Sequence, residues 1–549
     1  MYFYKVVIIP KKYRIPLSVL SGLLLGLSWI PSFTFLIFLA LVPFFIVERS
    51  ISTDESILSK NKFLFWYSYL TFFVWNLTAT WWVAYASFGG AAMAIVCNAL
   101  LMAFTYLIYL FSVKKINSIY RIFIFIPFWL SFEYLHTDWD LSWTWLTLGN
   151  VFAFKTSWIQ WYEYSGVSGG SFWILIVNCI LFIFLSQLTK YSLKKKIIIF
   201  AIFMFSLILP LLLSFLVKEI HHPLNTLQKR KINVNALIIQ PSFNPYNEKF
   251  DIPFIEQFSE LKKLINNKID TSTDYLILPE TYIPHQYLGD EIYENVIDQH
   301  PYIRLFFDSL VRQYPRLHVV TGADTHYQYA DGEEHQPTAR KYSDVDKYFD
   351  CYNSSIQIAK NKPLTVYHKS KLVPGVEMMP FPRVFGLLAD LAIKMGGTSG
   401  SLGRQDQREV FDGPKGAKVG TAICYESIFG EHVAEYVQKG ANVLFILTND
   451  AWWDDTPGYR QHLAYACLRA IETRKYIARS ANTGISCVIN DMGEIIKSTG
   501  WYEKAVIKYS IPINNNTTFF VRNGDVLSKI FLFLSLAILL LTFILRFKK

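Results

Sequence analysis

The pattern of hydrophobic and polar positions divides the chain into two strongly apolar regions around a mixed central region. Hydrophobic runs lie near residues 15–30, 33–48, 63–83, 90–113, 121–135, 166–187, 197–217 and 528–545. A helix of about 20 apolar residues spans the hydrocarbon core of a membrane. We therefore predict eight transmembrane helices, of which the first two form a tight hairpin at Pro31. A cleaved signal peptide is a poor alternative for the first run, because no small-residue cleavage site follows it.

Lysines and arginines are concentrated in every second loop between these runs. The loops that carry them, together with the two ends of the chain, contain Lys5, Lys11, Lys12, Arg14, Arg49, Lys60, Lys62, Lys114, Lys115, Arg121, Lys190, Lys194, Lys195, Lys196, Arg546, Lys548 and Lys549. The alternate loops carry only Lys155. Basic residues in short loops remain on the cytoplasmic side of a membrane. The sequence therefore predicts that both termini are cytoplasmic and that residues 218–522 lie outside the cytoplasm.

The central region alternates short apolar runs with amphipathic stretches, which is typical of a layered α/β domain. Candidate strands lie at 234–239, 275–278, 318–322, 354–359, 418–423, 443–448 and 484–489, and candidate helices include 254–265 and 459–478. The predicted domains are therefore a seven-helix membrane part at 1–217, a catalytic part at 218–522, and an eighth helix with a basic tail at 523–549.

Composition supports a membrane protein and excludes several other classes. Of the 549 residues, 52% are hydrophobic and 17% aromatic, which is high for a soluble protein. The net charge of +10 does not indicate nucleic-acid binding, because many of the basic residues lie between hydrophobic runs. The six cysteines show no CxxC spacing, and no zinc pattern or phosphate-binding loop is present. We predict no metal and no cofactor.

Three candidate catalytic residues each follow an apolar run. Cys424 ends the run 418–423, Glu280 follows 275–278, and Lys369 follows Tyr367 and His368. Active groups gather at the carboxyl ends of strands in parallel α/β sheets, and a thiol nucleophile needs a base or a cation to activate it. Each residue also has a simpler explanation: a buried core cysteine, a capping carboxylate and a solvated surface lysine.

These segments together resemble the nitrilase superfamily and, within it, the bacterial apolipoprotein N-acyltransferase family. The matching segments include Leu-Pro-Glu-Thr at 278–281 and Ile-Cys-Tyr-Glu at 423–426. The others lie at 145–150, 166–169, 367–377, 448–452 and 479–486. The resemblance covers nearly the whole chain. It implies a nitrilase-like αββα sandwich domain inserted in an eight-helix transmembrane domain.

The resemblance also implies a role for each site residue. Glu280 would be the general base, Lys369 the cation that stabilises the tetrahedral oxyanion, and Cys424 the nucleophile. Glu377 matches a second, supporting glutamate. Tyr425 and Glu426 match the residues beside the nucleophile, where a backbone amide could add to the oxyanion hole.

The reaction implied by the resemblance uses two lipid substrates. Cys424 would take an acyl chain from a phospholipid, and the resulting thioester would be attacked by the α-amino group of a diacylglyceryl-cysteine at the N-terminus of an apolipoprotein. The enzyme would be a monomer in the bacterial inner membrane with its catalytic part on the periplasmic side. Two alternatives stay open: a membrane-anchored nitrilase-type amidase, and a non-catalytic scaffold.

Two positions depart from the family pattern. Gly375 and Val376 precede Glu377 where the family has Phe-Gly, and Phe250 stands where a tryptophan is expected. The stretch 384–392 has apolar residues at helical spacing, which predicts either a helix packed on the domain or a lid that enters the membrane surface, with 396–400 as its hinge.

Overall fold

The computed structural model describes residues 9–547 except 117, 190, 228–231, 245, 247, 250, 284–291, 295–299, 302, 343–344 and 382–400. Phe250 and the predicted lid and hinge therefore lie outside the described residues. The chain forms two compact units. The first takes its residues from Met1–Ala84, Phe88–His222 and Asp525–Lys549, and the second from Tyr85–Ser87 and Pro223–Gly524. The predicted domain boundaries stay a prediction, because a compact unit need not be a domain that folds alone.

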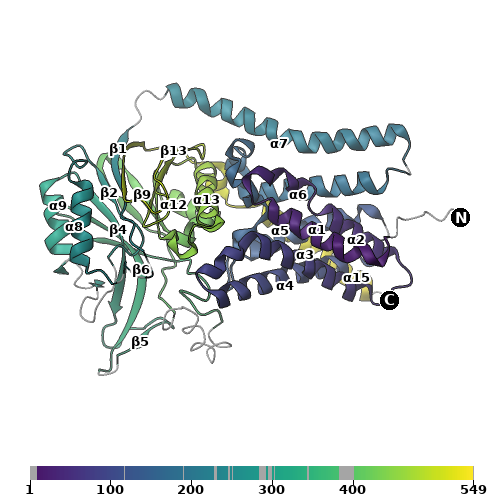
Figure 1. Ribbon diagram of the computed structural model, residues 1–549, viewed down its shortest axis with the longest axis horizontal. Coiled ribbons are helices and arrows are strands. Elements are labelled where there is room, and N and C mark those ends of the chain that lie inside the picture. Colours follow the sequence, from purple (N-terminus) through teal and green to yellow (C-terminus); the bar gives the residue numbers. More distant parts are fainter. Residues whose placement is uncertain are drawn as a thin grey trace. The chain divides into compact units, whose positions relative to one another are not determined.

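The first unit is a bundle of helices (Figure 1). Its principal helices are α1 (Arg14–Leu27), α2 (Val42–Thr53), α3 (Lys60–Thr80), α4 (Phe88–Val113), α5 (Phe125–Leu135), α6 (Tyr162–Ser186), α7 (Leu193–Leu227) and α15 (Val526–Phe547). Each predicted hydrophobic run thus contains helix.

Five segments in the described part of the chain are long and apolar enough to cross a membrane. They are Pro31–Thr53, Phe88–Val113, Tyr162–Ser186, Leu193–His221 and Val526–Arg546. The first of these is not one regular helix, because it contains the 3-10 helix η2 (Pro31–Phe38) before α2 begins. Helices α1 and α5 have 14 and 11 residues and are shorter than a membrane is thick. The count of eight spans therefore stays a prediction.

Buried polar side chains and glycines link the helices of this unit. Asn178 of α6 accepts from the Leu41 amide at 2.9 Å and donates to the Ile37 carbonyl at 2.9 Å, which satisfies the backbone where η2 and α2 meet. Gly149 lies in the 3-10 helix η6 (Leu148–Phe154), and its carbonyl accepts a hydrogen bond from Tyr162 at 2.9 Å. A methyl group on Gly149 would lie 2.0 Å from the Val167 carbonyl oxygen, so only glycine permits this contact. Such hydrogen bonds and small residues are what holds helices together in lipid.

The second unit contains two β-sheets. Among the described residues the larger sheet has the order β14-β1-β2-β4-β6-β5, with β3 beside β4 and β7 beside β6, and the smaller has the order β13-β12-β11-β10-β9-β8. The strands of the larger sheet are β1 (Asn233–Gln240), β2 (Tyr275–Ile277), β3 (Ile292–Tyr293), β4 (His318–Gln328), β5 (Arg340–Lys341), β6 (Tyr348–Ala359), β7 (Thr365–His368) and β14 (Ala505–Pro512). Those of the smaller sheet are β8 (Val410–Asp412), β9 (Lys418–Ile423), β10 (Val443–Thr448), β11 (Ile477–Ala481), β12 (Cys487–Ile489) and β13 (Ile495–Ser498). Strands β1, β2 and β4 are parallel, as are β9, β10 and β11.

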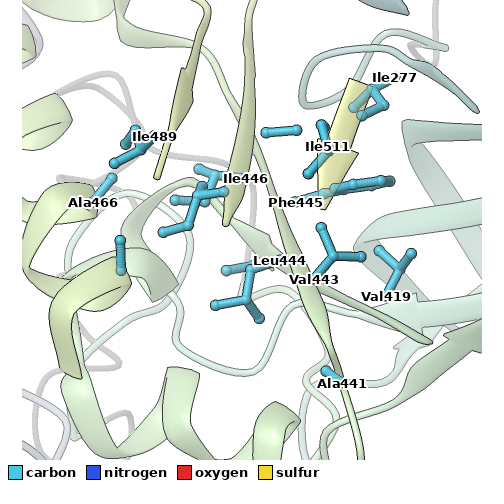
Figure 2. Close-up of a cluster of buried hydrophobic side chains, with 14 of the residues drawn as sticks. Ile277, Val419, Ala441, Val443, Leu444, Phe445, Ile446, Ala466, Ile489 and Ile511 are labelled. Atoms are coloured by element: carbon cyan, nitrogen blue, oxygen red, sulfur yellow. The ribbon is translucent and has the colours of Figure 1, made fainter. Parts of the chain in front are cut away.

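The alternation of side chains along these strands builds four layers. In β1, Ala236 and Ile238 belong to the core shared with the smaller sheet, whereas Leu237 and Ile239 pack with α8 (Phe254–Ile265) and α9 (Asp308–Gln313). Figure 2 shows side chains of both sheets in the first of these cores, among them Ile277 of β2 and Phe445 of β10. Helices α12 (Gly430–Gln438) and α13 (Pro457–Thr473) pack on the smaller sheet (Figure 1). The order helix, sheet, sheet, helix is the predicted αββα sandwich.

Candidate active site

Cys424 lies where β9 ends and the 3-10 helix η12 (Cys424–Ile428) begins. Its φ of 49° places it in the left-handed region, which a residue with a side chain enters at a cost on the order of 1–3 kcal/mol. Strain of this kind persists only where the surrounding structure enforces it. The thiol is thus presented on a sharp turn at the carboxyl end of a parallel strand.

Glu280 and Lys369 form a buried ion pair. Glu280 follows β2 by three residues, and Lys369 follows β7 directly. The Lys369 ammonium lies 3.1 Å from Glu280 Oε1 and 2.7 Å from Glu377 Oε1. Only 1% of Lys369 is exposed, so this ammonium is paired with two carboxylates rather than solvated.

The same two groups act on the thiol of Cys424. Burial raises the pKa of Cys424 above its ordinary value, the Glu280 carboxylate raises it further, and the Lys369 ammonium lowers it. The net shift is upward. The resting thiol is therefore protonated at neutral pH and needs a base to become a nucleophile.

Lys369 stays charged in this site. Burial alone would lower the pKa of Lys369, but the carboxylates of Glu280 and Glu377 outweigh burial and hold the pKa well above its usual range. An ammonium has three N–H donors. The two carboxylates occupy two of them, so the third can serve a developing oxyanion.

Glu377 is held by the loop that carries it. Its Oε2 accepts from the Val373 amide at 2.8 Å, while its Oε1 faces Lys369. Gly375, one of the two residues that depart from the family pattern, has a φ of 77° and donates its amide to the Met378 carbonyl at 2.8 Å. Glycine adopts this conformation without strain, so the altered loop forms a tight turn that still brings Glu377 to Lys369.

Glu426 connects the segments that carry Lys369 and Cys424. Its Oε1 accepts from the Ser370 amide at 2.6 Å and from the Tyr367 hydroxyl at 2.7 Å, and its Oε2 accepts from the Ile423 amide at 2.8 Å. Burial opposes ionisation, but His432 and these amides outweigh it and lower the pKa of Glu426 to about 2. Its contacts are those of a residue that positions the site. The adjacent Tyr425 is buried and packs edge-on against Phe429.

Two further residues that the sequence did not identify also contact the site. The side-chain amide of Asn353, in β6, donates to Glu280 Oε1 at 2.8 Å and to Glu377 Oε1 at 3.2 Å. The buried Lys249 donates to the Glu280 carbonyl at 3.0 Å, and burial lowers its pKa to about 8. Asn353 lies in a predominantly buried strand and Lys249 in a loop, and neither has a local sequence signal.

The motifs at 448–452 and 479–486 meet at Asp450. Arg479 Nη2 lies 2.5 Å from Asp450 Oδ2, and a methyl group on Gly484 would also lie 2.5 Å from this oxygen. Asp450 is distant in sequence from Arg479 and Gly484, and all three residues are buried together. Among the described residues, no group of three or more His, Cys, Asp or Glu side chains is arranged to hold a metal ion.

Comparisons with known proteins connect both units to one family. A family model described as carbon-nitrogen hydrolase matches residues 254–517, and a model described as the N-terminal domain of apolipoprotein N-acyltransferase matches residues 21–180. An apolipoprotein N-acyltransferase of Chlorobaculum tepidum is 28% identical over 538 residues, which cover 94% of each chain. That of Bdellovibrio bacteriovorus is 27% identical over 550 residues, which cover 94% of this chain and 91% of the relative.

Among solved structures, the chain is similar to Nit3 of Saccharomyces cerevisiae, a member of branch 10 of the nitrilase superfamily. The TM-score is 0.36 at 15% identity, with 51% of this chain and 90% of Nit3 covered. The two family models and the relatives that align over nearly the whole chain show that the protein is similar to apolipoprotein N-acyltransferases in both of its units.

Proposed function

We propose that the protein is an N-acyltransferase that moves a fatty acyl chain from a phospholipid to the N-terminal diacylglyceryl-cysteine of apolipoproteins, through a thioester on Cys424. Similarity to apolipoprotein N-acyltransferases over nearly the whole chain supports the overall reaction. The ion pair of Glu280 and Lys369 beside a protonated thiol supports the mechanism.

The first half of the reaction forms the acyl-enzyme. Glu280 takes the proton from the Cys424 thiol, and the sulfur attacks the ester carbonyl of the phospholipid. The carbonyl oxygen becomes an oxyanion that Lys369 stabilises through its third N–H group. The tetrahedral intermediate collapses as the ester C–O bond breaks, and Glu280 returns the proton to the alkoxide. A lysophospholipid leaves and the thioester remains.

The second half transfers the acyl chain to nitrogen. The neutral α-amino group of the lipoprotein attacks the thioester carbonyl, again forming an oxyanion beside Lys369. Glu280 accepts the proton from the attacking nitrogen. The C–S bond then breaks, the amide is released, and the Cys424 thiolate regains the proton.

The observation that carries this mechanism is the position of Lys369 between two carboxylates. Lys369 is paired with Glu377 as well as with Glu280, and Asn353 donates to both carboxylates. Glu280 can therefore gain and lose a proton while the ammonium remains paired with Glu377. Glu377 thus acts as the permanent counter-ion and leaves Glu280 free for proton transfer.

The membrane setting is part of the proposal. Five apolar segments in the described part of the chain are long enough to span a bilayer, and we include the three shorter or more polar helical runs to give eight spans. Both termini would then be cytoplasmic, and the α/β unit would be on the periplasmic side of the inner membrane. Two substrates that are themselves embedded in lipid explain why a nitrilase-type domain is joined to such a bundle.

Product analysis tests the proposal and separates it from the alternatives. The purified protein is incubated with a phospholipid that carries an isotope-labelled acyl chain and with a synthetic diacylglyceryl lipopeptide. We expect labelled N-acyl lipopeptide, and none from the Cys424→Ser variant. Labelled free fatty acid in its place would show a hydrolase, and no turnover of either kind would favour a scaffold.

A further inference from the structure

A buried hydrogen-bond network ends on the backbone carbonyl of the nucleophile. The Cys424 carbonyl oxygen accepts from the Ser427 hydroxyl at 2.7 Å and lies 3.1 Å from His462 Nε2. The Ser427 hydroxyl and His462 Nε2 are themselves 3.0 Å apart. Ser427 and His462 are 1% and 0% exposed, so both polar groups are held inside the protein.

The network is fixed from the far side by a buried salt bridge. His462 Nδ1 lies 2.9 Å from Asp450 Oδ1, which also accepts from the Thr448 hydroxyl at 2.8 Å. Asp450 Oδ2 is paired with Arg479. The imidazole therefore cannot turn without breaking the bond to Asp450, and Asp450 cannot move without breaking the pair with Arg479.

The network fixes the orientation of the peptide plane between Cys424 and Tyr425. The peptide between Cys424 and Tyr425 is trans, because the described chain contains no cis peptide bond, so its C=O and N–H groups point in opposite directions. Fixing the carbonyl oxygen of Cys424 therefore fixes the direction of the Tyr425 N–H group. The φ of 49° at Cys424 is the strained conformation that such an anchor must maintain.

We infer that Ser427 and His462 are positioning residues that hold the Cys424–Tyr425 peptide so that the Tyr425 amide can donate to the oxyanion, and that Asp450 and Arg479 hold His462 for this purpose. The inference rests on the proposed function only in requiring that an oxyanion forms at Cys424.

Two reactions of the Cys424 thiol distinguish a change in the orientation of the Tyr425 amide from a general loss of thiol reactivity. Acylation of Cys424 by a short-chain p-nitrophenyl ester passes through an oxyanion, whereas alkylation by iodoacetamide displaces iodide and forms none. The ratio of the two rates therefore reports the oxyanion contacts and is insensitive to the amount of folded protein. We choose Ser427→Ala, which removes a single hydroxyl, and His462→Gln, whose amide can still donate to the Cys424 carbonyl.

Ser427→Ala should lower the acylation-to-alkylation ratio about tenfold, less than the 10²–10³ lost when an oxyanion donor is removed outright. His462→Ala should lower the ratio more, and His462→Gln should recover part of it. The matched control is Thr473→Val, which removes a buried hydroxyl bonded at 2.7 Å to the Arg469 carbonyl in the same helix as His462. The control should leave the ratio unchanged.

The inference is overturned if acylation and alkylation fall by the same factor, if only alkylation falls, or if neither changes. A wild-type protein that is acylated by the nitrophenyl ester but not by phospholipid would defeat the proposed function, while the ratio would still decide the inference. A wild-type protein that is acylated neither by the nitrophenyl ester nor by phospholipid would defeat both the proposed function and the inference.

Discussion

At the scale of single residues, the reactivity of Cys424 is set by two neighbours of opposite charge. Glu280 raises the pKa of the thiol and Lys369 lowers it. Glu280→Gln should therefore move the pH profile of iodoacetamide alkylation to lower pH, and Lys369→Met should move it to higher pH. Both variants should lose acyl transfer, by about 10²–10³ for the oxyanion donor Lys369.

The matched control for this prediction is Lys360→Met, which neutralises an exposed lysine in the same unit. Its alkylation profile and acyl transfer should match those of the wild type. Shifts of equal sign in the Glu280 and Lys369 variants would show that the two charges do not act on the thiol as described.

Glu426 makes stability depend on pH. Its folded pKa of about 2 lies below the ordinary 4.5, so the folded state binds its proton more weakly than the unfolded state does. The stabilisation, on the order of 3 kcal/mol, is fully present above pH 4.5 and is lost as pH falls toward 2. Chemical unfolding in detergent should show this loss in the wild type, and Glu426→Gln should be less stable at pH 7 and less sensitive between pH 4.5 and 2. Equal pH dependence in the two proteins would contradict the account.

At the scale of elements, hydrophobic patterning predicts the central strands best. The predicted strands 418–423 and 443–448 agree with β9 and β10, and the predicted helix 254–265 agrees with α8, because these elements are buried and bounded by turns. The predicted helix 459–478 was wrong at its end. Helix α13 stops at Thr473, Arg474 takes a left-handed φ of 52°, and the chain enters β11 at Ile477. Pairing of β11 with β10 overrides the helical periodicity there.

The residues of the site likewise fall into those that could be predicted from sequence and those that could not. Cys424, Glu280 and Lys369 could be proposed from sequence because each follows an apolar run in a recognisable motif. Asn353 and Ser427 could not, because their roles depend on contacts with Glu280 and with the Cys424 carbonyl that only the fold creates.

The edge strands β8 and β13 are short, and they carry too few residues for a periodic signal.

The close approach of η6 and α6 provides a test within the helical unit. In Gly149→Ala the new methyl group would meet the Val167 carbonyl oxygen at 2.0 Å, and backbone cannot move aside as a side chain can. Overpacking of this kind costs about 1–3 kcal/mol or more. Thermal unfolding in detergent should show a lower midpoint than in the wild type. In the control Gly500→Ala the methyl group meets only the flexible side chain of Glu503. An equal decrease in the unfolding midpoint of this control would contradict the explanation by backbone contact.

At the scale of the whole molecule, the account requires the α/β unit and the two termini to lie on opposite sides of the membrane. Alkaline phosphatase is active only outside the cytoplasm. A fusion after Asn515, in the loop that follows β14, should therefore be active, and a fusion after Lys549 should be inactive. A fluorescent protein that matures only in the cytoplasm should give the reverse pattern. Activity of the C-terminal phosphatase fusion would contradict the predicted orientation.

The acyl-enzyme is the species on which the whole account depends, and intact-mass spectrometry measures it directly. After incubation with a phospholipid of defined chains, the protein should gain the mass of one acyl group, and fragmentation should place that mass on Cys424. Addition of a diacylglyceryl lipopeptide should remove the mass from the protein and add it to the peptide. A protein that turns over lipid without gaining an acyl group, or that carries the group on another residue, would contradict the proposed mechanism.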